Sequence, residues 1–511
     1  MEGTIFYIFG ATGDLAKRKL FPALFSLYCE GKLDENFVVV GLARRPKSQE
    51  QFREDVKQSI SEFARHKLKD EQSWSKFAAH FYYMSLDIQN AEGFTDLLHL
   101  TTKLESQYTT SGNRLFYLAL APELFGPVSH HLLQGGLLET SGWHRLVIEK
   151  PFGYDLASAE TLNQQLREVF EEKDIYRIDH YLGKDMVQNI EFVRFANTIL
   201  EPLWNHTYIA NVQFTVSETV GVEERGSSYD QSGALRDMGQ NHMLQMLMMI
   251  AMEPPVRLDG EGIRDEKTKV LRSLRVHSTR DDVHEHVVRA QYSSGSIQGK
   301  PLTGYTDEQS VQPNSTTETF FAAKLYVDNE RWSGVPFYMR TGKRMPIKTT
   351  EIVVEFKNIA NTTYLAQKHQ VEPNLLVIRV NPMEGIYLKM NAKKPGSDGV
   401  IIPIAMDFCQ SCQVGYNTPE AYERLIYDAV RGDSTYFTNW DEVSLAWRYV
   451  DRILKVWSSE SDDLTQYPAG SWGPFESMQL LARDGFKWWP VNGQNEGEVN
   501  WVDVSTSIQG A

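Results

Sequence analysis

Short apolar runs alternate with helical stretches over the first part of the chain, up to about residue 180. Four runs are dense in apolar residues, which is typical of strands buried on both faces of a parallel sheet. They lie at 5–9, 37–45, 114–122 and 145–153. Helical stretches accompany them at 50–68, 91–106 and 155–172. Strands that alternate with helices predict a Rossmann-like parallel α/β sheet.

The pattern changes beyond that point. Alternating or densely apolar stretches of β type recur at 208–218, 286–295, 319–328, 351–357 and 374–390. Helices are predicted around 234–252 and 419–457. Because turn residues often join the strands directly, we expect a large antiparallel sheet. We therefore predict two domains, a parallel α/β domain over 1–176 and a larger α+β domain over 177–511.

The composition agrees with such a protein. At 511 residues the chain is too long for one compact core. No stretch approaches the ~20 apolar residues of a membrane span, and the chain enters its first strand without the features of a signal peptide. The formal net charge of −15 argues against nucleic acid or an anionic membrane as partner. We expect a cytoplasmic protein.

The cysteines add little chemistry. Cys29, Cys409 and Cys412 are too few for a disulfide framework. Cys409 and Cys412 have the spacing of a metal or redox pair, but no second pair of ligands accompanies them. We expect reduced thiols and no metal.

The first turn has the character of a dinucleotide-binding loop. Gly10 and Gly13 end the first strand and Ala16 follows one helical turn later. Small residues there let the backbone approach a pyrophosphate at a helix N-terminus. The spacing departs from G-x-G-x-x-G and glycine pairs occur in ordinary loops, but the position between a buried strand and a helix favours a nucleotide site. Gly31 is placed to end that helix.

The end of the second strand indicates which dinucleotide. An NAD site would have Asp or Glu there to hold the ribose 2′-hydroxyl, whereas this chain has Arg44 and Arg45. Arginine suits a 2′-phosphate, and Thr12 can donate a further hydrogen bond. The residues favour NADP, with solvated basic side chains as the alternative and NAD not excluded.

The stretch RIDHYLGKD, residues 177–185, gathers ionisable groups around one glycine near the predicted domain boundary. His180, Tyr181 and Lys184 could together donate hydrogen bonds to a phosphate. From the residues alone, a polar turn between domains is the simpler interpretation.

Oxidation of an alcohol by hydride transfer would also require a base that accepts the hydroxyl proton. His242 lies in a predicted helix that is apolar over most of its surface, where a histidine is more often structural. A carboxylate that orients the ring would change this interpretation. Asp237 is five residues earlier and would face elsewhere on an α-helix. Asp179 is a better candidate, although sequence spacing cannot place it beside His242.

These motifs resemble those of the glucose-6-phosphate dehydrogenase family, with a pattern similar to the enzymes of Gram-positive bacteria. The similarity runs from end to end. It rests on GATGDLAKRKLFPAL, EKPFG (149–153), RIDHYLGK, GALRDMGQNHMLQ, VPFYMRTGK, AYERLI and YPAGSWGP. RIDHYLGK is highly specific, whereas EKP also occurs in other sugar dehydrogenases.

The resemblance implies roles for individual residues. It implies His242 as the general base and Asp179 as its carboxylate partner, with Pro151 in a cis bond. Phosphate and sugar contacts are implied for Lys150, His180, Tyr181, Lys184, Glu218, Asp237, Lys343 and Lys348. Coenzyme contacts are implied for Gly10, Thr12, Gly13, Asp14, Leu15, Arg44 and Lys150.

The resemblance also implies the reaction, an NADP-dependent oxidation of glucose 6-phosphate at C1 to 6-phosphogluconolactone. The first domain would bind the dinucleotide, and the second would bind the sugar and support a homodimer or homotetramer. Animal members carry a second, structural NADP. This chain keeps Arg379 and Lys393 but lacks a full set of those residues, so we expect no structural cofactor.

Two alternatives remain from the sequence. One is a related sugar or polyol dehydrogenase that shares the lysine of EKP but needs no phosphate cluster. The other is a non-catalytic NADP-binding protein that keeps the fold. The presence of Asp179, His242 and Lys150 disfavours the second.

Overall fold

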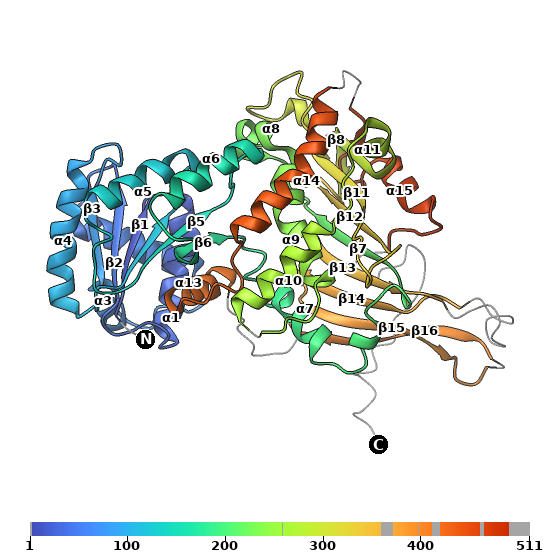
Figure 1. Ribbon diagram of the computed structural model, residues 1–511, viewed down its shortest axis with the longest axis horizontal. Helices are drawn as coiled ribbons and strands as arrows, with labels where there is room; N and C mark the ends of the chain where they lie inside the picture. The colour runs from blue at the N-terminus through green and yellow to red at the C-terminus, as the bar shows by residue number, and fades with distance from the viewer. Residues whose placement is uncertain are drawn as a thin grey trace.

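The protein is described by a computed structural model, which covers residues 3–257, 259–358, 371–397, 399–410, 420–459 and 464–489. The N-terminal sheet and its helices lie on the left of Figure 1, and a larger sheet lies on the right. Within these residues, no helix is both long and apolar enough to cross a membrane.

Six parallel strands form the N-terminal sheet among the described residues, in the order β3-β2-β1-β4-β5-β6. They are β1 Ile5–Phe9, β2 Val38–Ala43, β3 Phe81–Ser85, β4 Arg114–Leu118, β5 His144–Glu149 and β6 Ile175–Ile178. This is the strand order of the Rossmann fold, so the predicted parallel sheet is confirmed. The apolar runs did not reveal β3 and β6, the two edge strands, because an edge strand needs less apolar sequence than a central one.

Helices connect these strands. They are η1 Ala16–Leu20, α1 Phe21–Cys29, α2 Gln49–Phe63, α3 Glu71–Ala78, α4 Glu92–Tyr108, α5 Phe125–Gln134 and α6 Leu156–Arg167, with short turns η2 Pro122–Leu124 and η3 Glu172–Asp174. Gly31 follows α1 with φ of +66°, and the N–H of Lys32 bonds back to the carbonyl of Leu27 at 2.9 Å. The predicted helix end at Gly31 is therefore confirmed.

The second sheet has nine strands among the described residues, in the order β16-β15-β14-β13-β7-β12-β11-β8-β17. In chain order they are β7 Ile209–Ser217, β8 Val287–Ser293, β11 Phe320–Tyr326, β12 Pro336–Gly342, β13 Thr349–Phe356, β14 Leu375–Asn381, β15 Gly385–Lys393, β16 Ile401–Cys409 and β17 Gln466–Pro468. A small hairpin, β9 Gly295–Ile297 with β10 Lys300–Leu302, stands apart. The sheet is mixed rather than purely antiparallel, because β7 pairs with β12, and β8 with β17, in parallel.

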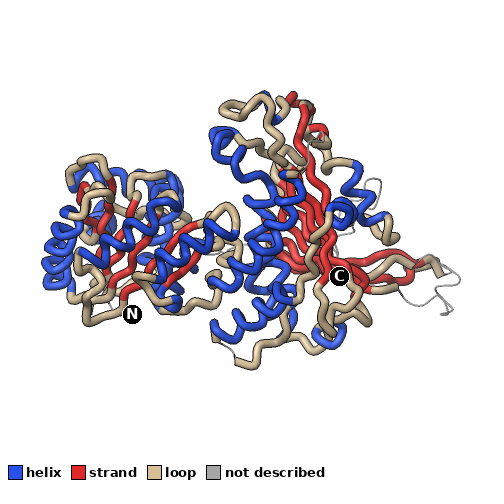
Figure 2. The backbone as a smooth tube through the Cα atoms, turned by 45° about the horizontal axis from the view of Figure 1, so that its top comes forward, coloured by secondary structure: helices blue, strands red, loops and turns tan. Residues whose placement is uncertain are grey.

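Helices fill the space between the two sheets, as Figures 1 and 2 show. The helices of this half are α7 Asp185–Phe195, α8 Gly226–Ala234, η6 Leu235–Met243, α9 Leu244–Ala251, α10 Gly260–Arg272, α11 Arg280–His286, α13 Ala421–Arg431, α14 Trp440–Ser458 and α15 Phe475–Ala482, with turns η4 Glu201–Leu203, η5 Glu223–Arg225 and η7 Tyr305–Asp307. One buried apolar cluster includes Tyr7 of β1, Trp447 of α14 and Phe214 of β7. The two sheets are therefore joined by a continuous core.

The helix α13, late in the chain, packs beside α1 of the N-terminal part (Figure 1). Leu425 and Ile426 of α13 share a buried cluster with Phe21 and Leu24 of α1. A helix from late in the chain therefore packs directly against the N-terminal sheet domain.

One expectation about the cysteines is corrected. Cys29 is free and exposed, as expected, but Cys409 at the end of β16 is disulfide-bonded. Arguments from overall composition do not test the state of a single cysteine. Cys412 lies outside the described residues.

Candidate active site

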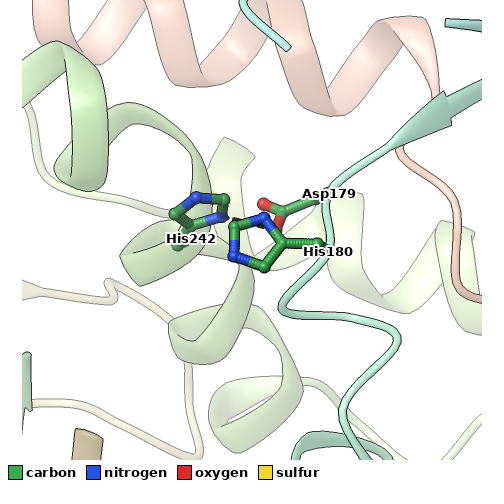
Figure 3. A group of neighbouring side chains, drawn as sticks. All are labelled: Asp179, His180 and His242. Atoms are coloured by element: carbon green, nitrogen blue, oxygen red, sulfur yellow. Dashed lines mark hydrogen bonds and ion pairs between the residues drawn. The ribbon is translucent and has the colours of Figure 1, made fainter. Parts of the chain in front are cut away.

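The candidate site begins where β6 ends. Asp179, His180 and Tyr181 follow Ile178, the last residue of β6, and α7 begins at Asp185. In open sheets of this kind, ligands bind at the carboxyl ends of the parallel strands. His242 approaches the same place from η6, as Figure 3 shows.

The structure pairs His242 with Asp179. The Nδ1 of His242 lies 2.5 Å from Oδ1 of Asp179, and Oδ1 also accepts the N–H of Tyr181 at 2.9 Å. The two side chains are 1% and 3% exposed. Because Nδ1 donates to the carboxylate, Nε2 is left as the basic atom. Within the described residues Nε2 has no hydrogen-bond partner, although it is buried. This is the geometry of a base with an orienting carboxylate.

Electrostatics support that arrangement. Burial lowers the pKa of His242 below the ordinary histidine value, and the charge of Asp179 only partly opposes this. Burial would raise the pKa of Asp179, but the neighbouring His242 and Lys150 outweigh it and hold the pKa at about 2. At neutral pH the carboxylate is therefore ionised and the imidazole is neutral, ready to accept a proton.

The local helix geometry brings Asp237 to the side of the helix that carries His242. η6 is a π-helix, in which residue i bonds to residue i+5. Residues five apart then lie one turn apart, so Asp237 does not face elsewhere as expected for an α-helix. Its charge raises the pKa of His242. The Nζ of Lys150 donates to the carbonyl of Asp237 at 2.9 Å and lies 3.6 Å from its Oδ1.

The residues of the RIDHYLGKD stretch surround His242. The rings of Tyr181 and His242 stack with centroids 4.3 Å apart, and His180 meets His242 edge-on at 4.6 Å. The Nζ of Lys184 lies 4.6 Å from the centroid of the Tyr181 ring. Burial and the nearby Lys348 together lower the pKa of Lys184 to about 8, against the opposing charge of Glu384. Two neighbouring cations suit a bound phosphate.

Three more predicted residues lie at one end of three central strands of the second sheet, β7, β12 and β13. β7 and β12 run parallel with Ser217 opposite Gly342, so the next residues, Glu218 and Lys343, lie side by side. Their charged atoms are 2.6 Å apart. Lys348 precedes β13, whose first residue pairs with Ser217. The hydroxyl of Tyr181 lies 3.5 Å from that of Thr350 in β13. This contact links the ends of these strands to the pair of His242 and Asp179.

The glycine turn lies at the carboxyl ends of β1 and β2. Gly10 has φ of +84°, and a Cβ there would lie 2.2 Å from the carbonyl oxygen of Ala119. Gly13 donates to the carbonyl of Gly10 at 2.8 Å and is exposed. Only glycine fits this closely folded turn, which agrees with a dinucleotide cradle.

The remaining coenzyme-side residues border the turn. Thr12 and Leu15 are half-buried, while Asp14 is exposed and bonds to Arg18 at 2.7 Å. Arg44 and Arg45 are exposed beyond the end of β2, which is the neighbour of β1. Hydrogen bonds from Ser85 and Tyr83 hold the main chain of the two arginines. The guanidinium groups are therefore available beside the turn.

Among the described residues, two groups have metal-ligand composition, Asp179 with both nearby histidines, and His277 with Asp282 and His286. In the first, a hydrogen bond already joins Nδ1 of His242 to Oδ1 of Asp179. In the second, the histidine rings stack 4.6 Å apart at 20°. An ion cannot then lie in the plane of both rings at bonding distance, so this arrangement does not suit a metal.

Comparison with known proteins identifies the family. The model of the glucose-6-phosphate dehydrogenase NAD-binding domain matches residues 7–189, and that of the C-terminal domain matches residues 191–489. The chain belongs to the glucose-6-phosphate dehydrogenase family. It is therefore an oxidoreductase of glucose metabolism, as the sequence predicted.

Relatives of this family agree over the full length. Glucose-6-phosphate 1-dehydrogenase of Bacillus subtilis is 52% identical, with 95% of this chain and 98% of the relative covered. That of Streptococcus pneumoniae is 45% identical, with 94% and 95% covered. A solved glucose-6-phosphate dehydrogenase in complex with its substrate has a TM-score of 0.88 at 38% identity, with 96% of this chain and 99% of that one covered. The predicted similarity to enzymes of Gram-positive bacteria is confirmed.

The structure brings the predicted residues of this glucose-6-phosphate dehydrogenase family member to two adjoining places. One is formed by the pair of His242 and Asp179, the predicted phosphate residues and the residues at the ends of β7, β12 and β13. The glycine turn with Arg44 forms the other. The peptide bond from Lys150 to Pro151 is cis, as the resemblance implied. The individual roles of the residues stay predictions.

Sequence reasoning missed a half-buried acid with a raised pKa beside the site. Glu149 accepts a hydrogen bond from Tyr117 at 2.5 Å, and Tyr422 of α13 also bonds to it. Burial raises the pKa of Glu149 to about 7. No spacing rule connects these three residues, since they come from three segments. Only the position of Glu149 next to Lys150 gave a signal.

Proposed function

We propose that His242 is the general base of glucose 6-phosphate oxidation in this chain. The observation that carries the proposal is the buried, unpartnered Nε2 opposite the bond to Asp179. Nε2 would take the proton of the C1 hydroxyl, while Asp179 stabilises the imidazolium that forms. The C1 hydrogen leaves as hydride and the C1–O bond becomes the lactone carbonyl.

The phosphate would be held by His180, Tyr181, Lys184 and Lys348, with the sugar ring over Lys150, Glu218, Asp237 and Lys343. Phosphate contacts fix the sugar so that C1 lies near Nε2, which turns binding energy into orientation. The two cations, Lys184 and Lys348, supply charge that the phosphate neutralises.

We infer that the dinucleotide is NADP. Gly10, Thr12, Gly13, Asp14, Leu15 and Arg44 would hold it, together with Lys150 on the substrate side. When bound, it supplies the hydride acceptor. The cradle at Gly10 and the exposed guanidinium groups at the end of β2 support a 2′-phosphate contact. Use of NAD alongside NADP stays open, and we expect no second, structural NADP.

One assay tests this proposal. Formation of reduced coenzyme is followed with glucose 6-phosphate or glucose, each with NADP or NAD. We expect a much higher kcat/KM for the phosphorylated sugar and for NADP. An equal rate with glucose would favour the sugar or polyol dehydrogenase, and no turnover with any pair would favour the non-catalytic alternative. In Arg44→Ala the preference for NADP over NAD should fall.

We also propose a homodimer or homotetramer in the cytoplasm. The edge strand β16 supports self-association, because Ile404, Met406 and Phe408 point to one face and are 38%, 55% and 48% exposed. Apolar side chains in such a row are typical of a protein interface.

A further inference from the structure

A small cavity lies on one side of Asp179, between β6, the helix that carries His242, and the start of α14. The polar residues of its lining include Lys150, Asp179, Gln245, Thr438 and Glu442, beside Gln240 and Asn241. It has room for about one water molecule. The cavity therefore touches one member of the histidine–carboxylate pair directly.

Three acceptor atoms of this lining are buried without a hydrogen-bond partner in the described part of the chain. They are Oδ2 of Asp179, Oε1 of Gln245 and Oε1 of Glu442. Each accepts hydrogen bonds, and a buried acceptor without a donor costs free energy. A small donor in this cavity would satisfy at least two of them.

Two neighbouring side-chain donors are already engaged with Glu442. The Nε2 of Gln245 donates to Oε2 of Glu442 at 3.0 Å, and the Nζ of Lys267 donates to the same oxygen at 3.1 Å. Lys267 and Glu442 form a buried ion pair, with side chains 1% and 0% exposed. Turning the amide of Gln245 around would place its oxygen against the carboxylate. The other oxygen of Glu442 is therefore left as an acceptor.

The backbone ties this cluster to both members of the catalytic pair. The N–H of Thr438 donates to the carbonyl of Arg177 at 3.0 Å, two residues before Asp179. Gln245 follows His242 by three residues on the continuous helix of η6 and α9. A change at Glu442 can therefore reach Asp179 through the cavity without unfolding either segment.

We propose that a water molecule in this cavity donates hydrogen bonds to Oδ2 of Asp179 and Oε1 of Glu442. Glu442, held by Lys267 and Gln245, is then a positioning residue for the base. The water holds the carboxylate so that Oδ1 faces His242. Its hydrogen bond also stabilises the charge of Asp179 and so weakens the attraction of that charge for the imidazolium of His242. This inference rests on the proposed role of His242.

The test uses two double variants that differ at one residue. Lys267→Met/Glu442→Leu removes the ion pair without leaving a lone charge, and Lys267→Met/Glu442→Gln keeps a polar group at the cavity. We expect the Leu variant to lose kcat by about tenfold or more, as when a group that orients a functional histidine is removed. Its KM for glucose 6-phosphate should stay near the wild-type value. The Gln variant should recover most of the rate.

The pH profile separates positioning from a merely structural role. Without the water, the charge of Asp179 is less stabilised and attracts the imidazolium more strongly, so the pKa of His242 rises. The acid limb of kcat/KM should move to higher pH in the Leu variant only. Wild-type kcat and an unmoved limb in a folded Leu variant would overturn the proposal.

Two further measurements cover the other outcomes. If the Leu variant does not fold, Glu442→Asp keeps the charge for Lys267 and withdraws the oxygen from the cavity. Glu442→Asp should show the same shift of the acid limb of kcat/KM, but a smaller one. Wild-type kcat and an unmoved acid limb in this variant would count against the proposal. The rate is also compared in sodium, potassium and tetramethylammonium salts. A rate that requires sodium or potassium would mean that a cation, and not a water molecule, occupies the cavity, and this would overturn the proposal. His242→Asn in the same assay tests the base itself, so the two proposals fail separately.

Discussion

His242 combines burial with a carboxylate, and each has a separate effect on its chemistry. Burial keeps the ring neutral near pH 7, and Asp179 fixes which nitrogen is basic. In His242→Asn the amide cannot accept the C1 hydroxyl proton, so kcat should fall by about 10²–10⁴ while KM for glucose 6-phosphate changes little. Steady-state kinetics measures this. His284→Asn, an exposed histidine of α11, is the matched control. A near-normal kcat in His242→Asn would remove this residue as the base.

The pH dependence follows from the same pair. Only neutral His242 accepts a proton, so kcat/KM should rise with pH through its pKa, which burial places below the ordinary value of about 6.5. The charge of Asp179 raises this pKa. In Asp179→Asn the pKa should fall, so the acid limb moves to lower pH while the plateau rate drops. An acid limb that stays in place would show that Asp179 does not act on the titrating group.

Lys184 gives a prediction on the alkaline side. Burial lowers the pKa of Lys184 to about 8, so the free enzyme loses this charge above that pH. A phosphate binds the protonated form, and KM for glucose 6-phosphate should therefore rise above about pH 8. Lys184→Ala should raise KM about 10- to 100-fold at neutral pH, the range of a charge-assisted hydrogen bond. Lys184→Arg stays charged and should keep KM flat with pH. Equal KM profiles in all three proteins would exclude Lys184 from the phosphate site.

At the scale of elements, periodicity predicted most central strands and the helices between them. Ile5–Phe9 is buried on both faces and reads as a continuous apolar run. Edge strands such as β3 gave weaker patterns, because one side pairs with no neighbour. The π-helix around His242 was not predictable from periodicity, since a change from i+4 to i+5 bonding depends on packing against elements far away in the chain, such as α14, β11 and β12.

The glycine turn is the element that the sequence described best. A Cβ at Gly10 would collide with the carbonyl of Ala119, so Gly10→Ala must displace the turn from the pyrophosphate position. We expect KM for NADP to rise at least tenfold, with KM for glucose 6-phosphate less affected. Gly31→Ala is a matched control, because it also has positive φ but nothing within 4 Å of the added Cβ. It should cost about 1–2 kcal/mol of stability and leave KM for NADP unchanged. Equal effects of both changes on KM would contradict the cradle.

At the scale of the whole molecule, the site is assembled from segments far apart in the chain. Asp179 and His242 are separated by 63 positions, and Glu218 meets Lys343 because β7 and β12 are parallel neighbours. Local spacing carries no information on such contacts. The family resemblance predicted these residues as a set. Physical reasoning from the sequence alone reached the glycine turn and the phosphate candidates, and it named His242 and Asp179 without being able to place them together. Glu149 and Glu442 escaped both routes, since their importance depends on burial.

The two faces of β16 differ, and this gives a test of the assembly. Ile404, Met406 and Phe408 form an exposed apolar row, while on the opposite face Asp407 pairs with Arg379 of β14. If the apolar row lies in the interface between copies, a charge placed there must be desolvated on association. Met406→Glu should shift the mass measured by light scattering from the oligomer to a single chain. Ala405→Glu adds the same charge to the polar face of the same strand and should leave the oligomer intact. Dissociation by both changes, or by neither, would place the interface elsewhere on the molecule.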